Sequence, residues 1–281
     1  MIPADSSAAI ADGAATATDF PVPTTLRVTR EGAVARVTLN RPDVRNAFND
    51  TVIGELTAVF DALGRDASLR AIVLGAEGKA FCAGADLNWM KAMAGYSWDE
   101  NHADAGRLAR MLWTIYSCPV PVIARVQGDV YAGGVGLVSV CDIVVATDGA
   151  GFCLSEARLG LLPATIGPYV VRALGEQASR RYFVTAERFS AADAHRLGLV
   201  HEVAAADQLD ATVDAFVAAL LANGPMAVRA CKRLVQDVAH APITPTLRDD
   251  TARRIADIRA SAEGRDGVQS FLSKGKPSWL A

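Results

Sequence analysis

The sequence predicts an α/β fold built on parallel strands. Short apolar runs rich in β-branched residues, which are typical of buried strands, return repeatedly after segments with helical spacing. Three such runs are RAIVLGA (70–76), PVIARVQG (121–128) and DIVVAT (142–147). The chain has 281 residues, of which 51% are hydrophobic and 21% charged, so it is long enough to bury one large core.

The first elements of the chain are predicted from turn and cap residues. Alternating apolar residues over 26–40 predict a hairpin with its turn at Glu31-Gly32. Asn49-Asp50 predicts the start of a helix that continues over 51–66, where apolar residues repeat at helical spacing.

The last third of the chain has a different pattern. Residues 191–274 are almost wholly helical in pattern, with one short strand candidate at 197–203 and breaks at Gly224-Pro225, Pro242 and Pro245. We therefore expect three parts: a leader over 1–24, an α/β core over 25–205 and a helical region over 206–281.

Composition excludes several classes of protein. The 28 Lys and Arg against 31 Asp and Glu give a formal net charge of -3 without a basic stripe, which disfavours a nucleic-acid partner. No apolar run predicts a membrane span, and the leader lacks the features of a signal peptide. Five cysteines without CxxC spacing and four histidines without metal-ligand spacing predict reduced thiols, no metal site and a cytoplasmic protein.

The stretch YAGGVGLVSVCD (131–142) raises the question of what approaches the backbone so closely. A dinucleotide-binding loop would need a third glycine where Ser139 stands, and the chain has no Walker motif. Gly133 would begin a helix whose first amides can donate to an oxygen. The alternative is that these glycines only allow the helix to pack tightly on a neighbour.

A second strand-to-helix turn lies upstream, in AIVLGAEGKAFCAGADLNWM (71–90). It reads as a strand, a polar turn, a loop of small residues over 82–85, and Asp86 in the first turn of a helix. Two such turns can supply the two N–H donors that stabilise a developing oxyanion. The pair of turns therefore indicates acyl-transfer or enolate chemistry.

Together these motifs resemble the crotonase superfamily, the enoyl-CoA hydratase and isomerase group. The resemblance is carried by LNRPDVRNAF (39–48), FCAGADL (81–87), AGGVGL (132–137) with CDI after it, SEARLGLLP (155–163) and FLSKGKPSW (271–279). It implies a ClpP/crotonase-like superhelix of repeated ββα units with a C-terminal helical trimerisation region, and so a homotrimer or hexamer. It also implies an acyl-CoA thioester substrate and no cofactor, since coenzyme A is part of the substrate.

The resemblance assigns roles to individual residues. It puts the two oxyanion amides on Ala85 and Gly133, where the thioester oxygen gains charge as an enolate forms. The positions implied to contact substrate or CoA are Arg45, Ala47, Ala83, Asp86, Leu87, Trp89, Tyr131 and Gly134. Trp89 and Tyr131, together with Met90, are candidates for lining the acyl pocket.

Two positions depart from the pattern of the family. Its archetypal hydratases use two glutamates, and the first of these positions is Gly136 here, whereas the second, Glu156, is retained. A lysine that often meets the CoA phosphates is replaced by Asn88. Arg45, Lys91 and Lys274 remain as candidates for the phosphates.

Glu156 lies in an apolar stretch, FCLSEARLGLL. Taken alone, its carboxylate could pair with Arg158 or cap a helix. Within the resemblance it is the general acid/base, and burial beside apolar neighbours should raise its pKa. Cys82 has no evident histidine partner, which disfavours a thiol nucleophile.

Three functions stay open. We expect an enoyl-CoA hydratase that works with Glu156 alone. The run 155–183 with VGLVSVCD resembles bacterial hydratases of methylglutaconyl-CoA-type substrates, and Arg158 and Lys91 are the candidates for binding a distal carboxylate. The alternatives are a Δ3,Δ2-enoyl-CoA isomerase that uses the same glutamate, and a non-catalytic acyl-CoA binder.

Overall fold

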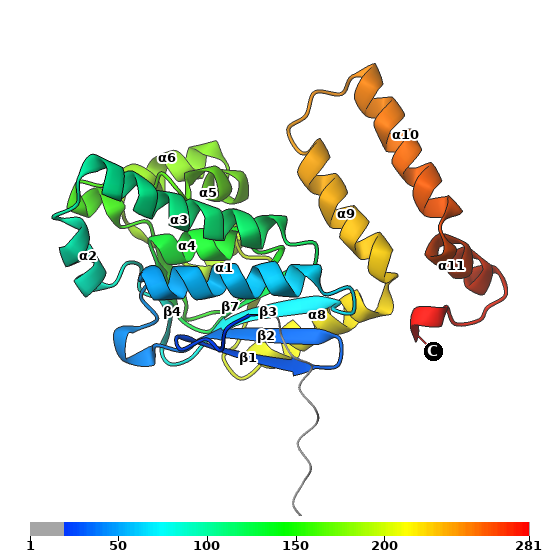
Figure 1. Ribbon diagram of the computed structural model, residues 1–281, viewed down its shortest axis with the longest axis horizontal. Coiled ribbons are helices and arrows are strands. Elements are labelled where there is room, and N and C mark those ends of the chain that lie inside the picture. The colour runs from blue at the N-terminus through cyan, green and yellow to red at the C-terminus, as the bar shows by residue number, and fades with distance from the viewer. Residues whose placement is uncertain (1–19, 281) are drawn as a thin grey trace, which may run out of the picture.

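Two β-sheets and the helices that pack on them form the α/β part of the computed structural model (Figure 1). The structure describes residues 20–280. One sheet has six strands in the order β1-β2-β3-β5-β7-β10, and the other has four in the order β4-β6-β8-β9. All neighbours are parallel except β1/β2 and β8/β9. The strands are β1 Leu26–Glu31, β2 Val34–Leu39, β3 Ala71–Ala76, β4 Ala80–Cys82, β5 Val122–Val126, β6 Asp129–Tyr131, β7 Ile143–Thr147, β8 Gly151–Cys153, β9 Arg188–Ser190 and β10 Glu202–Ala204. The α/β prediction with parallel pairing is confirmed.

From β3 to β8, consecutive strands alternate between the two sheets. In each of the pairs β3/β4, β5/β6 and β7/β8, the first strand joins the six-stranded sheet and the second joins the four-stranded one, and helices follow. This is a repeated ββα unit. The second sheet is not evident from the sequence, because each of its strands is three residues long.

The helices fill the connections and the C-terminal third of the chain. The α-helices are α1 Asp50–Arg65, α2 Leu87–Met93, α3 Trp98–Ser117, α4 Gly133–Ser139, α5 Gly167–Leu174, α6 Glu176–Thr185, α7 Ala191–Arg196, α8 Leu209–Ala222, α9 Pro225–Val238, α10 Pro245–Ala260 and α11 Ala262–Leu272. Short 3-10 helices are η1 Pro42–Val44, η2 Glu156–Leu159 and η3 Ser278–Leu280. Among the described residues no single helix is long and apolar enough to cross a membrane, and α8 and α9 together satisfy that test only as a pair bent by 108°.

Local predictions hold with small shifts. Asn49 caps α1 by accepting a hydrogen bond from the Val52 amide, as the sequence indicated. The hairpin turn lies one residue later than predicted, at residues 32 and 33, because Gly32 takes the positive φ of 58° that the turn needs. The strand predicted at 197–203 is only β10, at 202–204.

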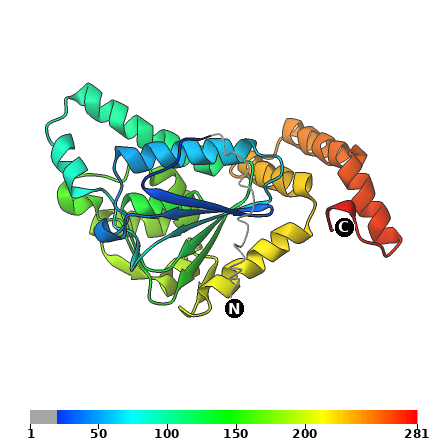
Figure 2. The same ribbon diagram turned by 60° about the horizontal axis from the view of Figure 1, so that its bottom comes forward.

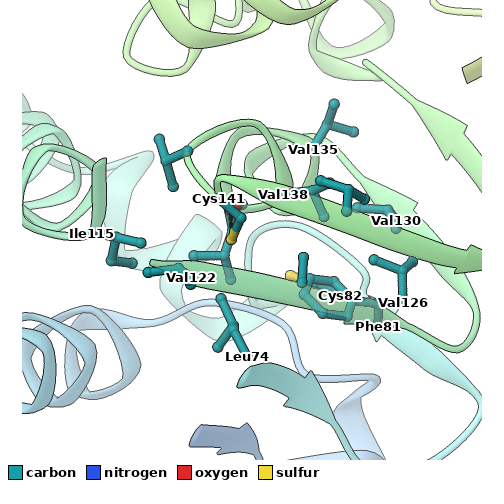
Figure 3. Packing of buried hydrophobic residues seen from close by; sticks show 14 of the residues in the cluster. Leu74, Phe81, Cys82, Ile115, Val122, Val126, Val130, Val135, Val138 and Cys141 are labelled. Atoms are coloured by element: carbon teal, nitrogen blue, oxygen red, sulfur yellow. Dashed lines mark hydrogen bonds between the residues drawn. The ribbon is translucent and has the colours of Figure 1, made fainter. Parts of the chain in front are cut away.

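The core lies between the sheets and the helices that cover them (Figure 3). Leu74 of β3, Val122 and Val126 of β5, and Val135 and Val138 of α4 are all buried in it. Helix α8 packs on the other face of the six-stranded sheet through Leu209, Val213 and Val217, so helices cover both faces (Figure 2). α8 therefore packs as part of the core, although the predicted boundary at 205 precedes it.

Helices α9, α10 and α11 extend away from the sheets (Figures 1 and 2). None of their residues is buried. Polar side chains join helix α9 to the core: Lys232 Nζ lies 2.6 Å from Asp142 Oδ2, and Arg229 donates to the carbonyl oxygens of Asp66 and Leu69. Most of the predicted leader, residues 1–19, lies outside the described residues.

Candidate functional site

Three strand ends meet at one edge of the four-stranded sheet. Strands β4, β6 and β8 are parallel neighbours, with Cys82 opposite Val130 and Tyr131 opposite Cys153. The carboxyl ends of parallel strands lie at the same sheet edge, where ligands bind in open α/β sheets. The segments that follow these strands carry Ala85, Gly133 and Glu156, so the structure brings the three predicted catalytic positions to one edge.

The Ala85 amide is held by backbone pairing with the segment 45–48. The Phe48 amide donates to the Gly84 carbonyl at 2.7 Å, and the Asp86 amide donates to the Phe48 carbonyl at 2.7 Å. These bonds form a parallel bridge between Phe48 and Ala85. Since the flanking residues make the bonds of the bridge, the N–H of Ala85 itself faces away from Phe48. Within residues 20–280 it donates to no backbone carbonyl.

The Gly133 amide is the first of helix α4. The first amides of a helix have no partner inside the helix, and they lie at the positive end of its dipole. A side chain on Gly133 would meet the ring of Phe48 at 3.1 Å. The ring therefore lies directly beside this turn.

The two amide-bearing turns pack against one another. Gly84 has φ +88°, and a Cβ added to it would lie 3.1 Å from the Cβ of Ala132. A Cβ on Gly134 would lie 2.8 Å from the Cβ of Cys82. Gly134 therefore fits the alternative that these glycines allow tight packing, because its α-carbon faces the side chain of Cys82.

Gly136, at the position of the first family glutamate, is buried and fully enclosed. A Cβ built there would lie 2.1 Å from Cγ2 of Ile166, the residue just before α5. Ile166 is itself 1% exposed. The side chain of Ile166 therefore occupies the space that an acid at 136 would need.

Glu156 begins the 3-10 helix η2 just beyond β8. Burial raises the pKa of its carboxyl group above the ordinary 4.5, although a hydrogen bond from its own backbone amide partly offsets this. Its Oε2 atom is buried and accepts no hydrogen bond from any residue of 20–280. Arg158 donates instead to the Ala186 carbonyl at 2.5 Å, so neither alternative role proposed for this glutamate, pairing with Arg158 or capping a helix by its side chain, is present.

A hollow of about 370 Å³ lies beside the Ala83 turn. Three of the residues implied to contact substrate or CoA line it, namely Arg45, Ala83 and Tyr131. Lys79, which was not among the predicted contacts, lines it as well. The signal available was a basic residue in the polar turn directly before FCAGADL.

Asp86 is buried, and both of its carboxylate oxygens have partners within the protein. It is 7% exposed, its Oδ1 caps α2 by accepting from the Asn88 amide, and its Oδ2 lies 2.8 Å from Arg41 Nη2. It is the N-cap of α2, one residue before the helical turn in which the sequence placed it. Burial favours the neutral form, but the bonds from Arg41 and Asn88 outweigh it and lower the pKa of Asp86.

The other candidate residues are spread more widely. Ala47 is buried, and its carbonyl accepts from Arg41. Leu87 is 74% exposed on α2, and Trp89 packs partly against the core. Lys91 is exposed on α2, and Lys274 follows α11 on the helices that extend away from the core (Figure 1).

Cys82 is fully enclosed at the end of β4. Burial raises the pKa of its thiol to about 12. A thiol with such a pKa carries almost no nucleophilic thiolate at neutral pH. Cys82 acts as core packing, as Figure 3 shows beside Phe81.

The arrangement offers two kinds of chemistry at one place. Two backbone N–H groups on separate turns can hold an oxygen that gains negative charge. One half-buried carboxyl group with a raised pKa can act as a general acid or base. Between residues 20 and 280, no group of three or more metal-ligating side chains is present.

Comparison with known proteins identifies the family. The family model described as enoyl-CoA hydratase/isomerase matches residues 29–281. The chain is 33% identical over 251 residues to enoyl-CoA hydratase ACTT6 of Alternaria alternata, covering 87% of this chain and 80% of that protein.

Solved structures agree with this assignment. An enoyl-CoA hydratase from Shewanella pealeana superposes with a TM-score of 0.88 at 42% identity, covering 91% of this chain and 96% of that one. One from Mycobacterium smegmatis gives 0.87 at 36% identity, covering 92% and 100%. The chain therefore belongs to the enoyl-CoA hydratase/isomerase family of the crotonase superfamily, as its motifs predicted.

Proposed function

We propose that this protein is an enoyl-CoA hydratase in which Glu156 is the general acid/base and the amides of Ala85 and Gly133 hold the thioester oxygen. The observation that supports this most is the position of a single half-buried carboxyl group with a raised pKa beside two turns with outward amides. The names of the relatives, which are enoyl-CoA hydratases, favour the same reaction.

The reaction needs two proton movements. Ionised Glu156 takes a proton from water as the water oxygen bonds to C3 of the 2-enoyl thioester. The electrons of the double bond move into the carbonyl, and the enolate oxygen is held by the two amides. Glu156 then returns the proton to C2, so that the elements of water are added and the carboxylate is regenerated.

An isomerase is the second candidate, and the packing at Gly136 favours it. A Δ3,Δ2 isomerase needs only one carboxylate, which removes a proton from C2 and returns it at C4. Ile166 fills the space beside Gly136, so no acidic side chain could stand at position 136 without repacking. A non-catalytic acyl-CoA binder is the third candidate, because the same turns would bind the thioester without turnover.

The CoA portion is assigned to the hollow beside the Ala83 turn. Arg45 and Lys79 both line it and could meet phosphate groups, whereas Lys274 lies on the extended helices. Phosphate recognition by lysine and arginine side chains is common in proteins. No metal or redox cofactor is needed in this proposal, since the thioester is activated by hydrogen bonds alone.

We also propose a branched, methylglutaconyl-CoA-type substrate. The support is the sequence resemblance over 155–183. Arg158 and Lys91, both exposed, are the candidates for its distal carboxylate, since the Arg158 guanidinium has further donors besides the one bonded to Ala186.

A panel of CoA esters tests these proposals. The purified protein is incubated with 2-enoyl-, 3-enoyl- and 3-methylglutaconyl-CoA, and the products are separated and weighed by mass spectrometry. A gain of one water on a 2-enoyl ester supports the hydratase, and conversion of a 3-enoyl ester at unchanged mass supports the isomerase. Binding without turnover of any ester would contradict both.

We propose that α9, α10 and α11 assemble the protein into a homotrimer or a hexamer of two trimers. They carry exposed apolar side chains, including Val235, Ile255, Phe271 and Leu272, and an apolar groove of about 590 Å³ lies between α9 and α10. Sedimentation velocity measures the assembly, and a monomer at micromolar concentration would contradict it. We also propose that the protein is cytoplasmic.

A further inference from the structure

A largely buried ion pair behind the Ala85 turn has no role in the proton transfers described above. Arg41, which follows β2, and Asp86, which follows Ala85, are 22% and 9% exposed in their side chains. Burial of charged groups destabilises the fold unless the attraction and hydrogen bonds between them compensate for the lost hydration. A buried ion pair therefore suggests a specific role.

The guanidinium of Arg41 joins two chain segments. Its Nη1 donates to the Ala47 carbonyl at 2.7 Å, and its Nη2 donates to Asp86 Oδ2 at 2.8 Å. Ala47 and Asp86 stand next to Phe48 and Ala85, the two residues of the parallel bridge. The planar side chain of Arg41 therefore links the residues that adjoin the two partners of the bridge.

The segment 41–47 is itself held rigid. The Asn46 side chain accepts from the Arg41 amide at 2.9 Å and donates to the carbonyls of Glu77 and Ala80. The Ala83 amide donates to the Arg45 carbonyl at 3.0 Å. Arg41 is thus fixed at its backbone, and its far end reaches the residue directly after the Ala85 amide.

We propose that Arg41 is a positioning residue for the reaction, which fixes the direction of the Ala85 N–H by clamping Ala47 and Asp86 together. This rests on the proposed function, in which that amide polarises the thioester carbonyl. Donors of this kind act only when they are aimed at the developing charge, so a small rotation of the turn weakens them.

Lysine cannot replace this clamp. Its ammonium is a single point charge on a flexible stem, whereas the arginine fork reaches two acceptors in a fixed plane. The substitution Arg41→Lys therefore keeps the charge beside Asp86 and removes the simultaneous bond to Ala47.

The experiment uses butyryl-CoA labelled with ¹³C at the thioester carbonyl, a saturated ester that neither hydration nor double-bond migration can consume. Isotope-edited infrared spectroscopy of the bound ester reports how strongly the carbonyl is polarised. Calorimetry measures its affinity, and thermal unfolding measures stability. For the esters that are turned over, kcat and KM are measured separately.

Arg30 offers a matched control. It also donates to a backbone carbonyl, that of Gly32, and to a carboxylate, that of Asp66. The two arginines are similarly buried, although Asp66 is more exposed than Asp86, and Arg30 joins β1 to the end of α1. Arg30→Lys should change thermal stability alone.

For Arg41→Lys we expect the carbonyl stretch to move back toward the value of the free ester, with kcat about tenfold or more below wild type and KM changed far less. Asp86→Asn, which keeps the α2 cap but removes the charge, should move the stretch the same way and serves if Arg41→Lys folds poorly. A wild-type stretch in both variants would overturn the proposal, as would a wild-type protein that does not shift the stretch at all. If no enoyl ester is turned over yet the stretch responds as expected, the proposed function fails while the role of Arg41 stands.

Discussion

Gly136 and Glu156 occupy the two positions at which archetypal hydratases of the family carry acids, and the structure treats them in opposite ways. Gly136 is enclosed, with the side chain of Ile166 in the space where its own would be. Glu156 is half-buried, and one of its carboxylate oxygens has no hydrogen-bond partner among the described residues. One position is thus committed to packing, and the other keeps an unsatisfied polar group. A half-buried carboxyl group with a raised pKa at a sheet edge is a candidate for proton exchange.

The largest expected effect is on the Glu156 side of this comparison. Glu156→Gln keeps the size of the side chain but removes the proton-exchanging group, so turnover should fall by about 10²- to 10⁴-fold. Steady-state rates on the substrate found in the ester panel measure this. Glu202→Gln, an exposed substitution on β10, is the control and should keep the wild-type rate. An unchanged rate in Glu156→Gln would remove this residue from the mechanism.

The next effect is on stability at the other position. Gly136→Ala forces a methyl group onto Ile166, and overpacking of this kind costs about 1–3 kcal/mol of the free energy of unfolding. Urea denaturation measures the loss. The double variant Gly136→Ala with Ile166→Ala should lose less free energy of unfolding than the two single variants lose in sum, because the added methyl then has room. Strict additivity would show that the contact is not the cause.

The smallest effect is on the pH dependence of stability. The pKa of Glu156 is raised in the folded state above the ordinary 4.5, so between these two values the folded protein binds more protons than the unfolded chain. The free energy of unfolding then falls as pH rises through that window. Glu156→Gln cannot titrate, so its free energy of unfolding should rise relative to that of wild type as pH rises above about 4.5.

Urea unfolding of both proteins across this range gives the difference curve, in which titrations common to both cancel. A flat difference curve would mean that the pKa of Glu156 is the same in the folded and unfolded states. Together the three measurements separate a position kept for packing from a position kept for chemistry.

Local patterns in the sequence were sufficient for part of the structure. The parallel strands, the capped start of α1 and the helical C-terminal third follow from periodicity and cap residues. Two of the turns that meet at the sheet edge were identified from their glycines and small residues, and the third, which carries Glu156, from motif resemblance. The structure places all three at one edge.

Other features depend on contacts between distant segments, which periodicity does not report. The four-stranded sheet is built from strands too short to show a period, and its pairing sets the site. That Ile166 fills the space beside Gly136 depends on the packing of α5 on α4, 30 residues apart in the chain. The pairing of Arg41 with Asp86 and the place of Lys79 beside Arg45 likewise appear only in three dimensions.

The polar attachment of α9 has a consequence for how the protein is made. Lys232 and Arg229 bind carboxylate and carbonyl groups of the core, while several apolar residues of α9 to α11, including Val235, Ile255 and Phe271, stay exposed within one chain. In the proposed assembly, the sheets can therefore complete their own packing before the chains associate. We expect refolding to show a first-order phase, in which the core forms, followed by a slower phase whose rate increases with protein concentration.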